Sequence, residues 1–491
     1  MERSSGILLH ISSLPGDGGI GCMGKDAYQF VDFLAQTKQK IWQILPLGPV
    51  GYGNSPYQCY SAFAGNPMFI DLNQLVADRL IAKDLITDQG FKTKKVEFER
   101  VEEWKSLLFK QAFIGFRKNF IRYKDEYHTF MSHNSWWLDD YALFRSLKSK
   151  NGETVWNTWS KELVSRDRHT LHIAFQELHE EVDYHRFLQF TFFRQWHKLK
   201  AYANSKKVSI IGDIPLYVSM DSVDVWANQD IFLLDKDSKP THVGGVPPDY
   251  FSETGQLWGN PVFDWDRVAH RDFDWWLARV NFNLQMFDMV RVDHFRGLES
   301  FWAVGAKEET AIVGEWLPAR GYELFRKLKE QHGSLNIIAE DLGVITPEVE
   351  RLRDDFQLPG MKILQFAFGS DPTNMDLPHN YKVNFIVYTG THDNDTSLGW
   401  FKSIGRKERR FLHKYISGKG KQFIENFIEN AWTSAAKTAI IPMQDLLGLD
   451  SDARMNTPGI AAGNWDWRFT WAQIRNNQKV FLKRITEKYN R

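Results

Sequence analysis

Cysteine is almost absent from this chain, whose 491 residues include only Cys22 and Cys59. Two thiols in a chain of this length do not form a disulfide framework, so we expect a reducing, cytoplasmic location. The two cysteines are not spaced like zinc ligands. The sequence also contains no HExxH, DxDxDG or Cys/His cluster, and it therefore predicts no metal site.

An excess of charge of one sign is also missing, because Lys and Arg number 61 and Asp and Glu number 61. Proteins that bind mainly nucleic acid usually carry a basic excess, so this class is not favoured. Long hydrophobic runs are missing too. Residues 41–70 are uncharged, but four prolines interrupt them, which argues against a membrane span. Residues 6–11 are too short for the apolar core of a signal peptide.

Aromatic residues, in contrast, are plentiful, with 36 Phe, 19 Trp and 16 Tyr. Many belong to the core, and any single ring is more often packing than a binding surface. Some lie in polar loops, as in residues 51–58 (GYGNSPYQ) and 464–468 (NWDWR). We expect residues 244–266 to form a substrate-facing loop. This distribution indicates a ligand recognised by stacking, either a sugar or a nucleobase.

Short apolar runs that end in acidic residues recur from residue 208 onward. They end at Asp213, Asp293, Glu340–Asp341, Asp393 and Asp445, and a further run covers residues 361–368. Helix signals lie between them, such as Thr346-Pro347-Glu348 as a helix start, and residues 25–38 also have helical spacing. With strands at residues 41–45 and near residue 70, about eight strands result. We predict a (β/α)8 barrel, an α/β fold, over residues 1–491, with a mostly helical insertion at residues 80–204.

The acids at the strand ends point to chemistry, because the carboxyl ends of barrel strands form one face. Converging carboxylates repel one another, so their convergence is explained either by a divalent metal or by acid/base catalysis on an uncharged substrate. Arg291 and Asp293 lie on the same side of a strand, so we expect the arginine to keep Asp293 ionised with a low pKa. An ordinary structural ion pair explains the same spacing.

Glu340 follows an apolar run, and burial there would raise its pKa and retain a proton. The alternative is a carboxylate bound by loop amides. His392 and Asp393 lie in a run of six polar residues after a strand, which indicates a site more than a core. These two residues could instead be metal ligands, although the rest of the sequence does not support a metal site.

Motifs spread over nearly the whole chain resemble the amylomaltases, the bacterial 4-α-glucanotransferases of the α-amylase superfamily. They include SSGILLHISSLPG from Ser4, GDIPLYV from Gly212, VRVDHFRG from Val290, AEDLG from Ala339 and ARMNTPG from Ala453. The GDIPLYV segment lacks the histidine of most α-amylases, which favours the amylomaltase branch. Residues 80–204 contain no diagnostic motif.

The resemblance implies a retaining enzyme that needs no cofactor and acts on malto-oligosaccharides, amylose or related α-1,4-glucans. By motif, Asp293 would be the nucleophile, Glu340 the acid and then the base, and Asp393 a binder of sugar hydroxyls. Retention requires the two reacting carboxyl groups to lie about 5–5.5 Å apart.

The resemblance also implies a set of substrate-binding residues. Asp213, Arg291 and His392 would line the donor subsite, Tyr57 would stack on the donor sugar, and Trp258 and Asn464 would contact the glucan. We expect the loops near Tyr57 and Tyr250 to bind the acceptor and exclude water. Alternatives are a hydrolase of the same fold, a non-catalytic glucan-binding protein and a metal-dependent barrel hydrolase.

Overall fold

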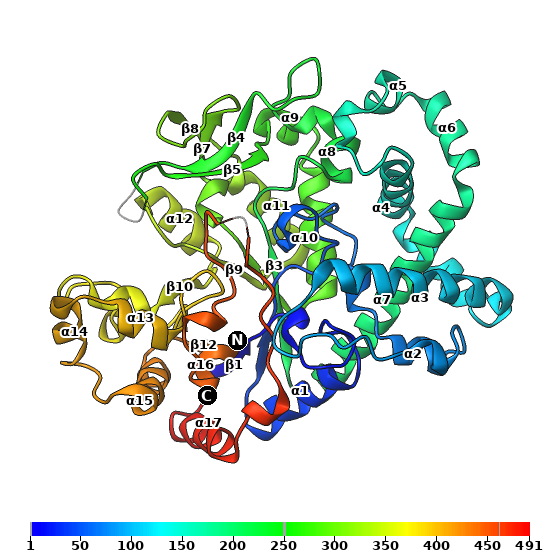
Figure 1. Cartoon of the computed structure of the whole chain (residues 1–491). Helices are drawn as coiled ribbons and strands as arrows, with labels where there is room; N and C mark the ends of the chain where they lie inside the picture. Colours follow the sequence, from blue (N-terminus) through cyan, green and yellow to red (C-terminus); the bar gives the residue numbers. More distant parts are fainter. Residues whose placement is uncertain (1, 249–251, 461) are drawn as a thin grey trace.

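The computed structural model describes residues 2–248, 252–460 and 462–491. Eight parallel strands at its centre form one sheet (Figure 1). In sheet order they are β10 (Gly360–Ile363), β11 (Phe385–Tyr388), β12 (Thr438–Pro442), β1 (Ser4–Leu8), β2 (Ile41–Gln43), β3 (Ser209–Ile214), β6 (Met289–Val292) and β9 (Ile337–Ala339). The backbone N–H of Ala339 donates to the carbonyl of Pro359 over 2.9 Å, so the two edge strands adjoin. The predicted barrel is confirmed.

The N-terminal strand β1 is the one that the sequence analysis did not identify. It pairs with β12 on one side and β2 on the other, and all five of its residues are buried. The strand expected near residue 70 is wrong because local capping turns that segment into helices. The Asn66 side chain accepts from the backbone N–H of Met68, and Asp71 caps α2 (Leu72–Ala77) by accepting from that of Gln74.

Helices surround the barrel, and two of them begin where the sequence analysis expected a helix. The helix expected at residues 25–38 is α1 (Lys25–Gln36), and the expected start at Thr346-Pro347 begins α12 (Pro347–Asp355). The others outside the insertion are α8 (Val223–Ala227), α9 (Trp265–His270), α10 (Asp274–Met286), α11 (Gly321–His332), α13 (Ser397–Ser403), α14 (Arg406–Leu412), α15 (Gly420–Thr433), α16 (Met443–Leu447) and α17 (Asn476–Lys488).

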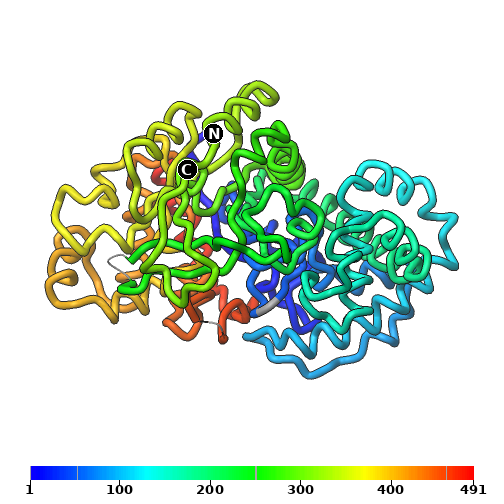
Figure 2. Tube along the Cα trace, turned by 90° about the horizontal axis from the view of Figure 1, so that it is seen from above, coloured from blue at the N-terminus to red at the C-terminus, as the bar shows by residue number. Residues whose placement is uncertain are grey.

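The segment expected as a helical insertion lies between β2 and β3. Its helices are α3 (Phe98–Lys118), α4 (Lys124–Lys150), α5 (Lys161–Val164), α6 (Arg168–Glu177) and α7 (His179–Ser205). They stand together on the right of Figure 1 and again on the right of Figure 2. The Trp196 indole N–H donates to the carbonyl of Met286 over 3.1 Å, which joins α7 to the end of α10 and thus to the barrel.

A second sheet was not predicted. It is antiparallel, with the order β5 (Gln256–Pro261), β4 (His242–Val246), β7 (Ser300–Gly305) and β8 (Gly314–Pro318). Residues 244–266, expected as a loop, therefore include the end of β4, all of β5 and the start of α9. Aromatic and glycine residues obscured the strand pattern. Tyr250 lies outside the described residues.

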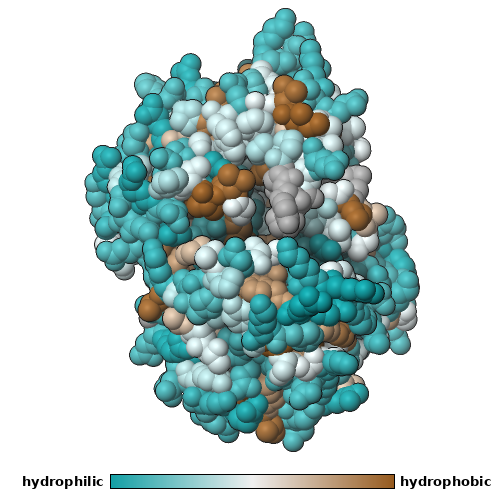
Figure 3. All heavy atoms as spheres, turned by 90° about the vertical axis from the view of Figure 1, so that its left-hand side faces the viewer, coloured by the Kyte–Doolittle hydropathy of each residue, from teal (hydrophilic) through white to brown (hydrophobic). Residues whose placement is uncertain are grey.

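The chain ends meet at one end of the barrel, as Figures 1 and 2 both show. Arg3 donates from Nε to the carbonyl of Tyr489 over 3.1 Å, and Arg491 donates from Nη1 to the carbonyl of Ser4 over 3.3 Å. Within the described residues, no helix has the length and apolar character needed to cross a membrane. The face in Figure 3 is mostly hydrophilic, and its hydrophobic side chains form small separate groups.

Candidate active site

The predicted acidic residues gather at the carboxyl ends of four barrel strands. Asp213 lies in β3, Asp293 directly follows β6, Glu340 directly follows β9, and Asp393 lies in the loop after β11. These strands are parallel, so their carboxyl ends meet on one face. The structure thus brings together side chains that are up to 180 residues apart in the chain.

Arg291 joins two of these acids. Its Nη1 lies 2.8 Å from each carboxylate oxygen of Asp213, and its Nη2 lies 2.9 Å from Oδ1 of Asp293. Arg291 and Asp213 are buried, whereas the Asp293 side chain remains 29% exposed. Burial alone would lower the pKa of Arg291, but Asp213 and Asp293 raise it well above its ordinary value. The guanidinium therefore stays positively charged.

The pKa of Asp293 differs from the sequence prediction. Burial raises it to about 6, although Arg291 acts in the opposite direction. The charges of Asp213 and Asp393 contribute to this rise. One guanidinium is shared between two carboxylates, so it does not offset both the desolvation of Asp293 and the charge of its acidic neighbours. The expected low pKa is wrong, although above pH 6 the carboxylate is still ionised.

Glu340 lies beside Asp293. Its Oε2 accepts from the backbone N–H of His294 over 2.5 Å, and its carbonyl accepts from the N–H of Phe295 over 3.2 Å. Burial raises the pKa of Glu340 to about 8; the charge of Asp293 adds to this rise, and Arg291 opposes it. The direction agrees with the expectation of a carboxyl group that retains its proton near neutral pH.

Asp393 is held by neighbours on two segments. His392 Nε2 lies 3.3 Å from Oδ2, and Asn456 donates from Nδ2 to Oδ1 over 2.6 Å. Arg454 donates to the carbonyl of Asp393 over 2.6 Å. Sequence reasoning did not assign Asn456 or Arg454 to the site. Their only signal was the motif ARMNTPG, which lies about 60 residues further along the chain.

Tyr57 forms an aromatic wall with His392 and Trp465. The rings of Tyr57 and His392 are stacked, with centroids 5.2 Å apart and planes 14° apart, and Trp465 lies within 6 Å of both rings. The Tyr57 hydroxyl donates to Oδ2 of Asp213 over 2.7 Å. This contact fixes Tyr57 beside the acids, and its stacking on a sugar stays a prediction.

Trp258 and Asn464 lie on different segments around the site. Trp258 is in β5, and its ring meets that of His294 edge-on with centroids 4.8 Å apart. Asn464 orders its own loop, since Oδ1 accepts from the N–H of Thr457 and Nδ2 donates to the carbonyl of Ile460. Contacts of either residue with a glucan stay predictions.

Two of the strand-end acids have structural partners instead. Asp341 is paired with Arg353 and accepts from the backbone N–H of Met361, which ties β9 to β10. Asp445 accepts from the hydroxyls of Thr389 and Ser397. Not every acid that ends a strand therefore belongs to the site. Among the described residues, no group of three or more His, Cys, Asp or Glu side chains is arranged to hold a metal ion.

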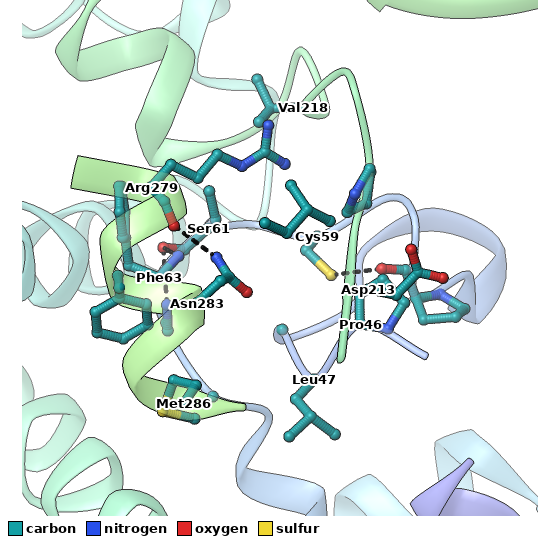
Figure 4. A pocket seen from close by; sticks show the side chains of 18 of the residues that line it. Pro46, Leu47, Cys59, Ser61, Phe63, Asp213, Val218, Arg279, Asn283 and Met286 are labelled. Atoms are coloured by element: carbon teal, nitrogen blue, oxygen red, sulfur yellow. Dashed lines mark hydrogen bonds between the residues drawn. The ribbon is translucent and has the colours of Figure 1, made fainter. Parts of the chain in front are cut away.

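A cavity of about 60 Å³ is lined in part by Tyr57 and Asp213, the second of which is labelled in Figure 4. Helix α10 contributes Arg279 and Asn283, which face the loop that carries Cys59. A bound water needs about 10–15 Å³ of such space, so the cavity admits only a few water molecules. It is too small for a sugar ring.

Known proteins resemble the whole chain. A family model described as 4-alpha-glucanotransferase matches residues 9–474. The 4-alpha-glucanotransferase of Synechocystis sp. is 49% identical over 100% of this chain and 98% of its own, and that of Thermus thermophilus is 46% identical over 99% of both. The solved amylomaltase from Streptococcus agalactiae in complex with acarbose is 41% identical, with a TM-score of 0.97 over 100% of both chains. On this evidence the chain belongs to the 4-α-glucanotransferase family.

Proposed function

We propose that this protein transfers segments of α-1,4-glucans from a donor to the 4-hydroxyl of an acceptor glucan or glucose. The observation that carries the proposal is the unequal environment of two neighbouring carboxyl groups. Asp293 contacts the Arg291 guanidinium, whereas the Glu340 carboxyl group accepts from the backbone N–H of His294, and the pKa values are about 6 and about 8. Between these values the first is ionised and the second is protonated.

This pair of states is what a retaining mechanism needs. Asp293 attacks the anomeric carbon, while Glu340 protonates the oxygen of the departing glucan. A covalent β-glucosyl–enzyme forms through an oxocarbenium-like transition state. The 4-hydroxyl of the acceptor, deprotonated by Glu340, then attacks the anomeric carbon and releases Asp293, so the α configuration is retained.

The other residues of the site support this pair. Asp393, held by Asn456, is placed to bind hydroxyls of the donor sugar. The wall of Tyr57, His392 and Trp465 offers the flat apolar surface on which a sugar ring packs. Such a wall also excludes water from the intermediate, which favours transfer over hydrolysis.

The amylomaltase from Streptococcus agalactiae binds the oligosaccharide analogue acarbose, which supports an oligosaccharide ligand here. We propose that malto-oligosaccharides and amylose are the partners, and that nucleic acid and membranes are not. We also propose a cytoplasmic location, because the two cysteines are free thiols. Fractionation of the producing cells tests the location.

Incubation with maltotriose, followed by separation of the products, tests the activity. We expect glucose together with a ladder of glucans longer than maltotriose. Glucose and maltose without longer products would instead identify a hydrolase of the same fold. Binding without any product would identify a glucan-binding protein. The Asp293→Asn variant is the inactive control.

A further inference from the structure

Arg296 is a buried cation that the mechanism above does not use. It lies three residues after Asp293, in the 3-10 helix η8 (Phe295–Leu298), and is only 5% exposed. Its Nη1 donates to the carbonyl of Val344 over 2.7 Å, and its Nη2 donates to Oγ of Ser300 over 3.2 Å. Val344 lies four residues after Glu340, so one guanidinium spans the loops that follow β6 and β9.

The same guanidinium also lies on the second sheet. Its Cζ is 3.8 Å from the ring centroid of Trp316 in β8, and the Trp302 ring of β7 packs 5.3 Å from that of Trp316. The Trp302 indole N–H donates to the carbonyl of Ala311 over 2.9 Å. A planar guanidinium supports such stacking and hydrogen bonding together, which lysine does not. The second sheet thus holds Arg296 in a single orientation.

What Arg296 holds in place is the short segment that contacts Glu340. His294 is in the left-handed region, with φ of 48°, and its N–H points at Oε2 of Glu340. The backbone N–H of Phe295 donates to the backbone carbonyl of Glu340. A backbone conformation that is strained for a non-glycine residue persists only where its surroundings enforce it. Arg296 lies two residues after His294, so its contacts fix the chain next to this strained residue.

We propose that Arg296 is a positioning residue that keeps the His294 N–H on Glu340 and so sets the geometry between Asp293 and Glu340. Through Trp316 it also makes this geometry depend on the second sheet. The inference rests on the roles proposed for Asp293 and Glu340. It concerns the general acid specifically, because the contacts of Arg296 reach the loop of Glu340 and not the sugar subsite.

The test compares two donors. Maltotriose needs protonation of its leaving group, whereas α-maltosyl fluoride releases fluoride without help from an acid. For Arg296→Met we expect kcat/KM for maltotriose to fall at least about ten-fold, since small misplacements of catalytic groups have effects of up to about 100-fold. We expect kcat/KM for fluoride release to change less than about three-fold, because the attack by Asp293 is retained.

A second readout is the pH profile. Loss of a hydrogen bond to the ionised form raises the pKa of a carboxyl group, so the alkaline limb for maltotriose should move upward by about half a unit or more. Arg296→Lys keeps the charge and should recover part of the lost activity. Trp316→Leu leaves the arginine intact and should shift both readouts in the same direction as Arg296→Met. If Arg296→Met does not fold, these two variants carry the test.

Arg409→Met is the matched control, since Arg409 also donates to backbone carbonyls and lies 5.0 Å from the ring centroid of Phe401, but on α14. This variant should leave kcat/KM unchanged for both donors. Equal losses on both donors for the Arg296 and Trp316 variants, or no loss on either, would overturn the inference. A wild-type protein that is inactive on both donors would instead overturn the proposed function.

Discussion

Arg291 is bound to Asp213 at least as closely as to Asp293. One of its nitrogens lies 2.8 Å from both oxygens of Asp213, and the other lies 2.9 Å from a single oxygen of Asp293. The arginine is therefore the shared cation of two acids on neighbouring strands. The charge state of Asp293 depends on Asp213, which is 80 residues away in the sequence.

Removal of the competing charge should make Asp293 more acidic. In Asp213→Asn, Arg291 retains only one carboxylate partner, and the charge that raises the pKa of Asp293 is lost. The acid limb of kcat/KM should move below pH 6, and the rate itself should also fall because Asp213 is a predicted sugar-binding residue. Tyr57→Phe removes a hydrogen bond to Asp213 without a change of charge and should leave the limb in place. An upward shift in Asp213→Asn would contradict this account.

The wild-type pH profile should be bell-shaped. The proposed mechanism requires ionised Asp293 and protonated Glu340, so kcat/KM for maltotriose should rise through about pH 6 and fall through about pH 8. The two limbs belong to the interacting pair rather than to either residue alone. Stopped assays across pH 4–10, with fluorescence to verify folding, provide the measurement. A profile that stays flat to pH 10 would exclude Glu340 as the acid.

Asp293→Asn should abolish turnover and leave glucan binding nearly unchanged. The amide has a similar shape but does not form the covalent intermediate, so kcat should fall by at least about 10⁴-fold, as losses of nucleophiles do. Calorimetric titration with maltotriose should give an affinity within a few-fold of the wild type. The same substitution at the exposed residue Asp237, Asp237→Asn, is the control and should leave turnover unchanged. Near-normal turnover of Asp293→Asn would remove the nucleophile assignment.

Glu340→Gln should be inactive but more stable at alkaline pH. The folded-state pKa of Glu340 is raised from 4.5 to about 8, so folded protein binds more protons than unfolded protein between these values. Wild-type stability therefore decreases over this range as pH rises, and the Gln variant lacks this decrease. The gain in Tm should grow between pH 5 and pH 8 to about 1–3 °C, given that ~1 kcal/mol shifts the Tm of large domains by a few degrees.

Differential scanning calorimetry at pH 5, 6.5 and 8 measures this gain in Tm. The exposed Glu330→Gln in α11 is the matched control and should show no gain that depends on pH. A Glu340→Gln advantage that shrinks as pH rises would show that the carboxylate is not disfavoured by burial.

Asn456→Ala should reduce activity without a loss of the fold. The amide of Asn456 holds Oδ1 of Asp393 over 2.6 Å, and a carboxylate without this donor is free to rotate away from the sugar. We expect kcat/KM for maltotriose to fall about ten-fold, a typical effect of a misplaced contact. Asn430→Ala, in α15 outside the site, is the comparison. Unchanged kinetics in Asn456→Ala would mean that Asp393 is held by other contacts.

Patterns within short stretches of sequence predicted most of the barrel. Alternation of apolar runs with helix signals identified seven of its strands in the right order, and Arg291 and Asp293 were correctly placed on one side of β6. These features depend on neighbours within a few residues, which is the range over which backbone periodicity and capping act. The sequence analysis did not identify β1 because its five residues are all buried and show little periodicity. It did not identify β4, β5, β7 and β8 because segments rich in Gly and Trp are typical of loops.

The sequence by itself determined which acids end the strands, and hence which side chains meet at one face of the barrel. Only the tertiary structure decided their charge states and their supports. Whether the pKa of Asp293 ends above or below its ordinary value depends on burial and Asp213 as well as on Arg291, and the hold on Asp393 depends on Asn456. The physical reason is that desolvation and Coulomb interactions act through space, between segments whose distance along the chain gives no sign of contact.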